Sequence, residues 1–289
     1  MRDYLLLHLV ILAWGFTAIL GKLIALPPVE LVLWRTALAA GGFALLARWR
    51  GRSLHVPAVE MRRMLGVGLL LGLHWMLFFA SARLATASVS LAALPTAMLW
   101  CSLIEPWVDG TRRWRPLELV VGAVMVGAVW MIYEVELRHW LGFTVALASA
   151  LAAAIFAVVN KQMVARWHHA VMGTYQMLGA FAACAVGWLV MTPFQFTVPT
   201  VTDMGWLLVL SSVCTVGAYA GYMDVLRRMS IFTVNVIYNL EPVYGILLAV
   251  LVFGAAEHMS GGFYLGAGII TASVLVVPWL RRWVGEAKG

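Results

Sequence analysis

Apolar residues run along this chain in long segments, and polar and charged residues gather in the short stretches between them. A helical segment of roughly 17 to 25 apolar residues is long enough to cross a lipid bilayer. Ten such segments predict ten membrane-spanning helices in an all-α integral membrane protein. The first five are Tyr4 to Leu26, Pro28 to Ala47, Met64 to Ala82, Leu84 to Val108 and Pro116 to Tyr133. The second five are Leu141 to Val164, Ala170 to Thr192, Gly205 to Leu226, Ile231 to Phe253 and Gly261 to Leu280.

The overall composition agrees with this pattern. Of the 289 residues, 63% are hydrophobic and only 11% are charged, and the mean hydropathy is +0.91. Soluble domains carry about 25% charged residues. The short polar stretches leave no room for a soluble domain, so we expect lipid to surround most of the chain.

The basic residues are distributed unevenly between the two sides of the predicted spans. All but four lie on one side, and these four are Lys22, Arg35, Arg83 and Arg138. Basic loops face the cytoplasm, so both termini are predicted to be cytoplasmic. The net charge of +7 thus reflects membrane orientation. We expect no nucleic-acid partner, because that role needs basic and stacking residues gathered on one surface.

The two halves of the chain resemble each other. The segment from Ala82 to Pro95 is echoed by the segment from Met229 to Pro242. When the two halves are aligned on these segments, identical residues fall at Met76 and Met223, Thr86 and Thr233, Val89 and Val236, and Pro95 and Pro242. Five helices per copy is an odd number, so the second copy must enter the membrane from the opposite face. We predict two inverted five-helix repeats, residues 1–138 and 139–289, within one membrane domain.

Prolines and glycines inside the spans indicate special helix geometry. Pro95 and Pro242 each remove a backbone donor, and interrupted helices mark binding sites in repeat-built transporters. These two prolines are therefore the predicted hinges. Three glycine pairs have the GxxxG spacing that allows two helices to approach closely, namely Gly68 and Gly72, Gly217 and Gly221, and Gly262 and Gly266.

The ten spans, the inverted repeat and several residues together resemble the drug/metabolite transporter superfamily, particularly its EamA-type permeases. These residues are Trp14 and Gly15 in the first span, Arg35 in the second, Pro95 in the fourth, and Glu241, Pro242 and Glu257 around the ninth. The resemblance implies a multi-pass carrier of the bacterial inner membrane that moves small metabolites, often outward, through a cavity between the halves. Arg113 stands near the first-half counterpart of Glu257, so the gating roles of the two halves are not expected to be strictly symmetric.

Glu241 is the most informative candidate for function. A carboxylate inside a lipid span costs roughly 2.5 to 3.5 kcal/mol on insertion scales, and its repeat counterpart is the apolar Leu94. Glu241 either contacts a proton or substrate, or it caps backbone groups freed beside Pro242. Asn235, Tyr238 and Asn239 share its helix at spacings of three and four residues, which predicts one polar face toward a cavity or a neighbouring helix.

A histidine and several aromatic residues are the remaining candidates for substrate binding. His74 lies mid-span, where it either forms a structural hydrogen bond or takes a proton during transport. Trp75 and Phe78 follow it by one and four residues, and their repeat counterparts around Tyr219 and Tyr222 are expected to give the facing half a similar aromatic wall. Trp14, also near mid-span, is a further candidate to face the pathway. Such aromatic walls suit amphipathic substrates or cations, although they also serve as ordinary packing.

Other charged residues have simpler interpretations. Arg35, about seven residues inside its span, is interpreted as extending to the outer membrane interface, with binding of an anionic substrate group as the alternative. Asp224 is expected to pair with Arg227 and Arg228 at a cytoplasmic helix end.

The sequence contains no GxxxxGK[ST], HExxH or CxxC motif, so nothing points to ATP, catalytic zinc or redox chemistry. We expect no cofactor, no metal and no enzymatic activity. The predicted function is alternating-access export of amino acids or related amphipathic compounds, with a small-molecule substrate, membrane lipid and protons as partners. The alternative is a membrane-embedded enzyme that modifies lipids or prenyl groups, with His74, Glu241 and Asp224 as acid and base.

Overall fold

The computed structural model describes residues 2–110, 116–135, 139–191, 196–254 and 260–283. Helix makes up most of every predicted span. The first-half elements are α1 (Arg2–Leu23), α2 (Pro28–Trp49), α3 (Ala58–Leu84), α4 (Ala87–Ala92), η1 (Leu94–Thr96), α5 (Ala97–Val108) and α6 (Pro116–Val135). The second-half elements are α7 (Trp140–Val164), α8 (His169–Met191), α9 (Val201–Ser211), η3 (Ser212–Gly217), α10 (Ala218–Arg228), α11 (Ile231–Tyr238), α12 (Glu241–Phe253) and α13 (Gly261–Trp283).

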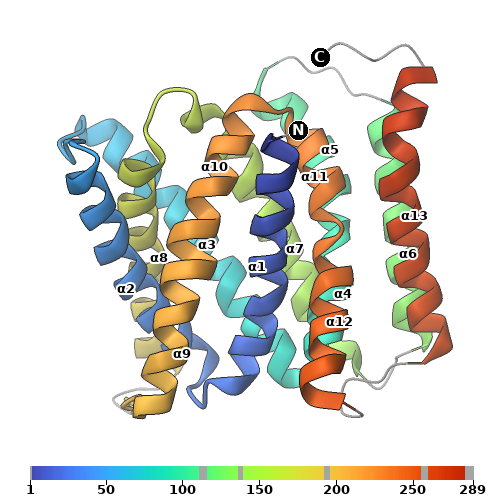
Figure 1. Cartoon of the computed structure of the whole chain (residues 1–289), viewed down its shortest axis with the longest axis horizontal. Helices are drawn as coiled ribbons and strands as arrows, with labels where there is room; N and C mark the ends of the chain where they lie inside the picture. The colour runs from blue at the N-terminus through green and yellow to red at the C-terminus, as the bar shows by residue number, and fades with distance from the viewer. Residues whose placement is uncertain (1, 111–115, 136–138, 192–195, 255–259, 284–289) are drawn as a thin grey trace.

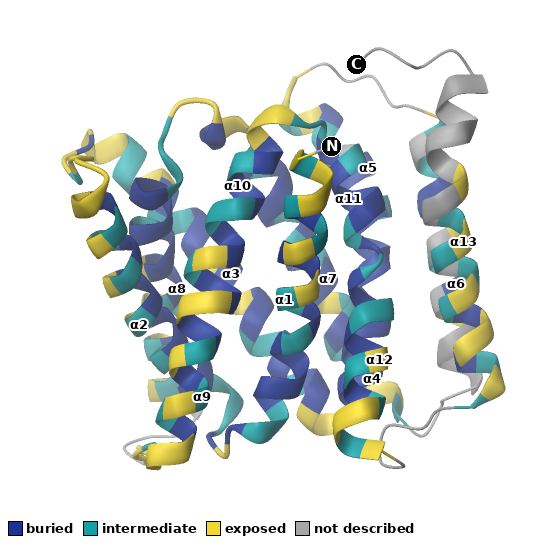
Figure 2. Cartoon of the chain, viewed as in Figure 1, coloured by how far each residue is buried: buried dark blue, intermediate teal, exposed yellow. Residues whose placement is uncertain are grey.

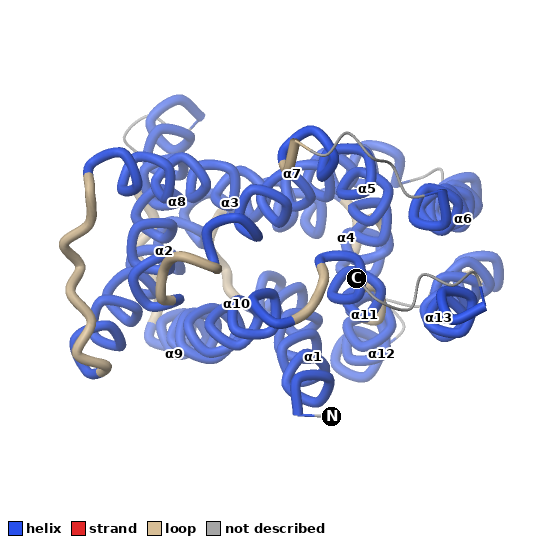
Figure 3. Tube along the Cα trace, turned by 90° about the horizontal axis from the view of Figure 1, so that it is seen from above, coloured by secondary structure: helices blue, strands red, loops and turns tan. Residues whose placement is uncertain are grey.

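The helices run roughly side by side, and α6 and α13 pair at one edge of the bundle (Figures 1 and 3). Within the described residues, eight segments are long and apolar enough to cross a membrane. The other two predicted spans correspond to helices α6 and α13. The all-α membrane fold is therefore confirmed, while the count of ten crossings stays a prediction. Glu257, Arg113 and Arg138 lie outside the described residues.

The outward surface of the bundle is suited to lipid. Exposed positions lie mainly on the outer faces of the helices (Figure 2). Among them are Leu45, Leu69, Leu247 and Leu251, which are 69%, 47%, 60% and 81% exposed. Leucine side chains at such positions would be unfavourable in water and are favourable in hydrocarbon.

Two predicted spans are broken near their middles, each at the proline that the repeat places there. The fourth span consists of α4, the short 3₁₀ helix η1 that contains Pro95, and α5. The ninth span consists of α11 and α12, separated by a turn at Asn239 and Leu240 just before Glu241 and Pro242. Proline lacks an N–H and disfavours α-helical geometry at the preceding residue, which explains both breaks. Their role as hinges stays a prediction.

Helix contacts recur in matched pairs across the two halves. Helix α3 packs on α7 and α8, and α1 and α2 pack on the corresponding α10 and α9. Helices α2 and α8 pack on each other, as do α6 and α13. Such pairing is what a twofold relation between residues 1–138 and 139–289 produces, although the division into these two repeats stays a prediction.

Glycines allow the closest of these contacts. A Cβ at Gly15 of α1 would lie 2.9 Å from the backbone nitrogen of Gly245 in α12. On α3, a Cβ at Gly68 would overlap the backbone of Gln176 in α8, and one at Gly72 would lie 2.8 Å from the carbonyl oxygen of Ala180. The predicted close contact at Gly68 and Gly72 is confirmed, because backbone atoms cannot rotate away as side-chain atoms can.

Replacing Gly68 by alanine is expected to destabilise the protein by about 1 to 3 kcal/mol, as overpacking of a tight contact does. Gly66→Ala is the control on the same helix, because a Cβ there has no neighbouring atom within 4 Å. Thermal unfolding in detergent should show a lowered midpoint for Gly68→Ala and an unchanged or raised one for Gly66→Ala. Equal midpoints for both variants would contradict the close packing of α3 on α8.

The ion pairs at the bundle end that carries the N-terminus differ from those expected. Asp224 contacts His169, with 2.9 Å between Oδ1 and Nδ1, while Arg228 pairs with Asp3 at 2.7 Å. Arg227 donates to the carbonyl oxygens of Val164 and Trp167. The expected pairing of Asp224 with these arginines was wrong, because α10 turns Asp224 toward the start of α8 and both arginines toward other helices.

Candidate functional site

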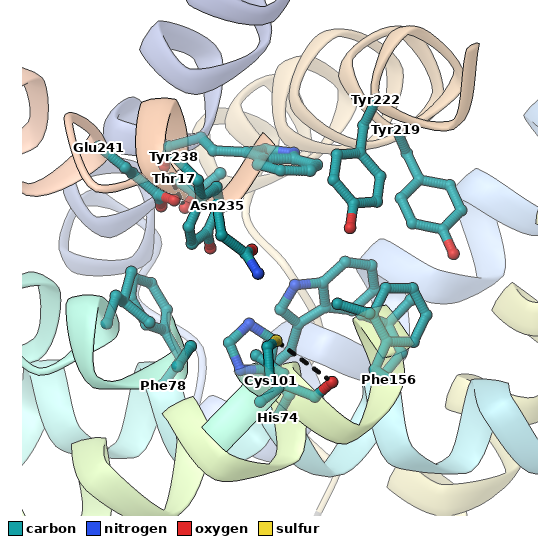
Figure 4. A pocket seen from close by; sticks show the side chains of 18 of the residues that line it. Thr17, His74, Phe78, Cys101, Phe156, Tyr219, Tyr222, Asn235, Tyr238 and Glu241 are labelled. Atoms are coloured by element: carbon teal, nitrogen blue, oxygen red, sulfur yellow. Dashed lines mark hydrogen bonds between the residues drawn. The ribbon is translucent and has the colours of Figure 1, made fainter. Parts of the chain in front are cut away.

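A cavity lies among the helices of both halves and is partly open, and the space between its walls, open solvent included, is about 730 Å³. Figure 4 shows side chains from several helices converging on it. Its lining residues are Trp14, Thr17, Arg35, Leu71, His74, Trp75, Phe78, Leu94, Ala97, Cys101, Ala153, Ala154, Phe156, Ala157, Tyr219, Tyr222, Asn235, Tyr238 and Glu241. All the predicted substrate-binding residues except Asn239 are among them. The helix breaks at Pro95 and Pro242 adjoin it through Leu94 and Glu241.

Asn239 occupies a different environment from its neighbours on the ninth span. It is 2% exposed, and its Nδ2 lies 3.5 Å from the sulfur of Met98. The turn that separates α11 from α12 directs this side chain toward α5. The polar face predicted from the sequence therefore reaches the cavity through Asn235, Tyr238 and Glu241.

Aromatic rings form one wall of the cavity. The Trp14 ring lies 5.1 Å from that of Tyr222 and 5.7 Å from that of Tyr238, between centroids. The rings of Tyr219 and Tyr222 are stacked at 6.3 Å. Trp14 is fixed in this place because its Nε1 donates to the carbonyl oxygen of Cys214 at 3.1 Å. The wall thus joins α1 to α10 and α11.

His74 is held by reciprocal hydrogen bonds with Ser149 of α7. Its Nδ1 lies 2.9 Å from the Ser149 carbonyl oxygen, and the Ser149 hydroxyl donates to the His74 carbonyl oxygen at 2.9 Å. A carbonyl oxygen can only accept, so Nδ1 carries the hydrogen. The structural hydrogen bond considered from the sequence is present, and Nε2 is the nitrogen left for a proton or another partner.

Glu241 is 3% exposed and is the first residue of α12. Tyr238 lines the cavity beside Glu241, and Glu241 Oε2 has no hydrogen-bond partner among the described atoms. The N-cap position of α12 is the apolar Leu240, which makes no side-chain cap hydrogen bond. A buried carboxylate oxygen without a partner is costly, which points to a ligand or proton that completes its environment.

Arg35 lies inside the bundle and does not extend to the outer membrane interface. It is 1% exposed and lines the cavity, with Nε donating to Thr215 Oγ1 at 2.8 Å. Its guanidinium carbon lies 3.8 Å from the ring centroid of Trp75. The interfacial interpretation was wrong because α2 presents this position to the interior, where η3 supplies the hydrogen-bond acceptor.

The eighth span contains a π-helical turn, η3, that the sequence did not predict. Within it the Thr215 hydroxyl donates to the carbonyl oxygen of Leu210, five residues earlier, at 2.8 Å. The same hydroxyl accepts from Arg35, and the Cys214 carbonyl accepts from Trp14. Single π-turns are frequent at functional sites. Here the turn positions two cavity residues that come from α1 and α2.

A buried hydrogen-bond network behind the aromatic wall was also missed. The Tyr219 hydroxyl donates to Gln176 Oε1, Gln176 Nε2 donates to Asn160 Oδ1 at 2.8 Å, and Asn160 Nδ2 donates to the Tyr219 oxygen at 3.4 Å. Gln176 and Asn160 are fully buried. The sequence did contain a sign of this network, since both amide side chains lie inside predicted spans. Unpaired polar groups are unfavourable in hydrocarbon, so such amides need hydrogen-bond partners within the protein.

Tyr219→Phe is expected to lower stability by about 1 to 3 kcal/mol, because it leaves the buried oxygen of Gln176 without its donor. Tyr222→Phe is the matched control, since Tyr222 lies on the same helix and wall but takes no part in this network. Thermal unfolding of both variants measures the difference. A Tyr219→Phe midpoint equal to that of Tyr222→Phe would show that the network does not stabilise the fold.

Comparison with known proteins agrees with this architecture. Residues 140–279 match the model of the EamA-like transporter family. A solved crystal structure of another protein superposes with a TM-score of 0.75 and 19% sequence identity, covering 98% of this chain and 98% of that chain. This likeness concerns the fold alone. No curated protein sequence matches the chain.

The family match confirms the resemblance to EamA-type permeases of the drug/metabolite transporter superfamily that the sequence indicated. It falls within residues 139–289, the second of the two predicted repeats. The matched region contributes the α7, α10, α11 and α12 sides of the cavity.

Proposed function

We propose that this chain, a multi-pass membrane protein of the EamA-like transporter family, is a secondary carrier that exports amino acids or related amphipathic compounds from the bacterial cytoplasm across the inner membrane. Transport would proceed by alternating access, with the substrate held in the central cavity and protons as the coupling ion. Pro95 and Pro242 would permit the two broken spans to change shape during the cycle.

The observation that carries the proposal is one cavity lined from both halves of the chain and containing a buried basic and a buried acidic side chain. Apolar and aromatic side chains occupy most of its surface, and Arg35, His74 and Glu241 supply the charge and hydrogen bonding. A pocket with a few polar groups in an apolar wall is typical of small-molecule sites. The two helix breaks beside it are where repeat-built carriers place their substrate.

The alternative membrane enzyme receives less support from the geometry. It requires His74, Glu241 and Asp224 to act on one reacting atom. Asp224 pairs with His169 at the end of the bundle and is not among the described cavity-lining residues. The proposed acid and base groups are therefore divided between two places.

Purified protein in liposomes provides the direct test. Uptake of radiolabelled amino acids, nucleosides and cationic drugs is measured with and without a pH difference, with protein-free liposomes as the control. The carrier proposal predicts protein-dependent movement of at least one amphipathic solute, accelerated by the proton gradient. Failure to move any of these solutes under either condition would overturn it.

A further inference from the structure

Arg35 is a buried cation with an incomplete set of partners. Among the described residues, its guanidinium makes one hydrogen bond, from Nε to Thr215. Trp75 covers one face of the guanidinium at 3.8 Å, and Phe79 lies farther away, at 5.8 Å from the guanidinium carbon. These contacts hold the group in place but leave the two terminal nitrogens without an acceptor from the described chain.

The cavity also contains an acidic side chain, but this side chain does not pair with Arg35 directly. Glu241 and Arg35 line the same cavity and are close enough for their charges to interact. They do not form an ion pair with each other, because none of the ion pairs of the described chain includes either residue. A buried charge without a close partner is strongly unfavourable. Each group is therefore left with unfilled hydrogen-bonding capacity.

We propose that Arg35 binds the carboxylate of a zwitterionic α-amino acid with an apolar side chain, whose ammonium group contacts Glu241. The assignment rests on the carrier function proposed above and names the substrate class of the same cavity. Arginine suits the role because its planar guanidinium binds carboxylates through two parallel hydrogen bonds. Thr215 occupies Nε, so the terminal pair of nitrogens remains for the substrate.

A zwitterion fits the site better than a simple anion or a simple cation. A simple anion would satisfy Arg35 and leave Glu241 Oε2 without a partner, whereas a simple cation would do the reverse. The zwitterion completes both groups and brings no net charge into the membrane interior. The apolar side chain is argued from the remaining lining, which includes Leu71, Phe78, Leu94 and Ala97.

The experiment compares ligands that differ only in one charged group. Binding of L-leucine, L-phenylalanine and L-methionine is measured against the corresponding decarboxylated amine and the deaminated acid of each. Titration of detergent-purified protein is followed by ligand-dependent thermal stabilisation and by tryptophan fluorescence, since Trp14 and Trp75 line the cavity. The native protein should bind at least one amino acid about 10-fold or more tightly than its amine, as loss of charge-assisted hydrogen bonds implies.

Two variants separate the roles of the buried charges. In Arg35→Gln the preference for amino acid over amine should fall to within about twofold, while the preference over the deaminated acid remains. In Glu241→Gln the preference for amino acid over the deaminated acid should fall, while the preference over the amine remains. Arg35→Lys keeps the positive charge but lacks the planar pair of donors, so its preference for amino acid over amine should lie between those of Arg35→Gln and the native protein. Each preference is a ratio measured on one sample, so it remains interpretable if a variant yields less folded protein.

The outcomes distinguish this assignment from the carrier function itself. If Arg35→Gln keeps the native preference for amino acid over amine, or if no native preference exists for any of the three amino acids, Arg35 is not the carboxylate site. Transport of another solute class in liposomes would then leave the carrier function standing. Selective binding without any transport would support the site and overturn the carrier.

Discussion

Reconstituted Glu241→Gln protein is expected to lose proton-driven accumulation of substrate while still exchanging it down a concentration gradient. Glutamine has nearly the same size and can remain at the start of α12, but it cannot take up and release a proton. With one proton exchanged per substrate, a pH difference of about one unit sustains about a tenfold concentration ratio in the native protein, because that difference is worth about 1.36 kcal/mol. The variant should give a ratio near one.

The expected loss follows from competition at one carboxylate. A proton and the ammonium group of an amino acid would both neutralise the Glu241 carboxylate, so one must leave before the other binds. Because the proton and the substrate exclude each other at this site, movement of a proton in one direction across the membrane is coupled to movement of the substrate in the other. Downhill exchange by the variant should persist at raised substrate concentration, since Arg35 and the aromatic wall are unchanged.

Glu30→Gln is the matched control for this measurement. Glu30 is 1% exposed and accepts a hydrogen bond from the backbone nitrogen of Thr197 at 2.9 Å, but it is not among the described cavity-lining residues. Its variant should retain the native accumulation ratio even if its stability falls. Accumulation that survives in Glu241→Gln, or that disappears equally in both variants, would contradict a specific proton role for Glu241.

The sequence predicted helix positions well because lipid imposes a simple rule on composition. A span must be apolar over its length, and a proline in its middle removes a backbone donor and can interrupt the helix there. The ten helical segments and the breaks at Pro95 and Pro242 follow from those two facts. The cavity lining was also largely predicted, since ionisable and polar residues in lipid usually face the protein interior.

The errors concern which way a side chain points and what it meets there. For Arg35 the sequence gives the distance from the span end but not the face of α2. That face is determined by Thr215 and Trp75, which lie on η3 and α3. The π-turn cannot be recognised from the spacing of apolar residues. The span is apolar on nearly all sides, so one extra residue per turn does not change its hydropathy pattern. Asp224 was assigned to nearby arginines, yet its partner His169 lies 55 positions away along the chain.

Filling the cavity from α7 is expected to abolish transport without unfolding the protein. Ala153 lines the cavity and is only partly buried, so a phenylalanine there would extend into space that the substrate is proposed to occupy. Uptake by Ala153→Phe should fall to the level of protein-free liposomes, since one aromatic ring displaces a molecule of similar size. Thermal stability should change little, because the ring enters an existing space and avoids overpacking a close helix contact.

Ala148→Phe provides the control on the same helix. Ala148 is exposed on the outer face of the bundle, where a larger apolar side chain would meet lipid, so transport should remain at the native rate. Loss of uptake only in Ala153→Phe would identify the cavity as the transport pathway, because both variants add the same ring to α7 and differ in the face that carries it. Normal uptake by a folded Ala153→Phe protein would mean that the solute crosses the membrane by a route outside this cavity.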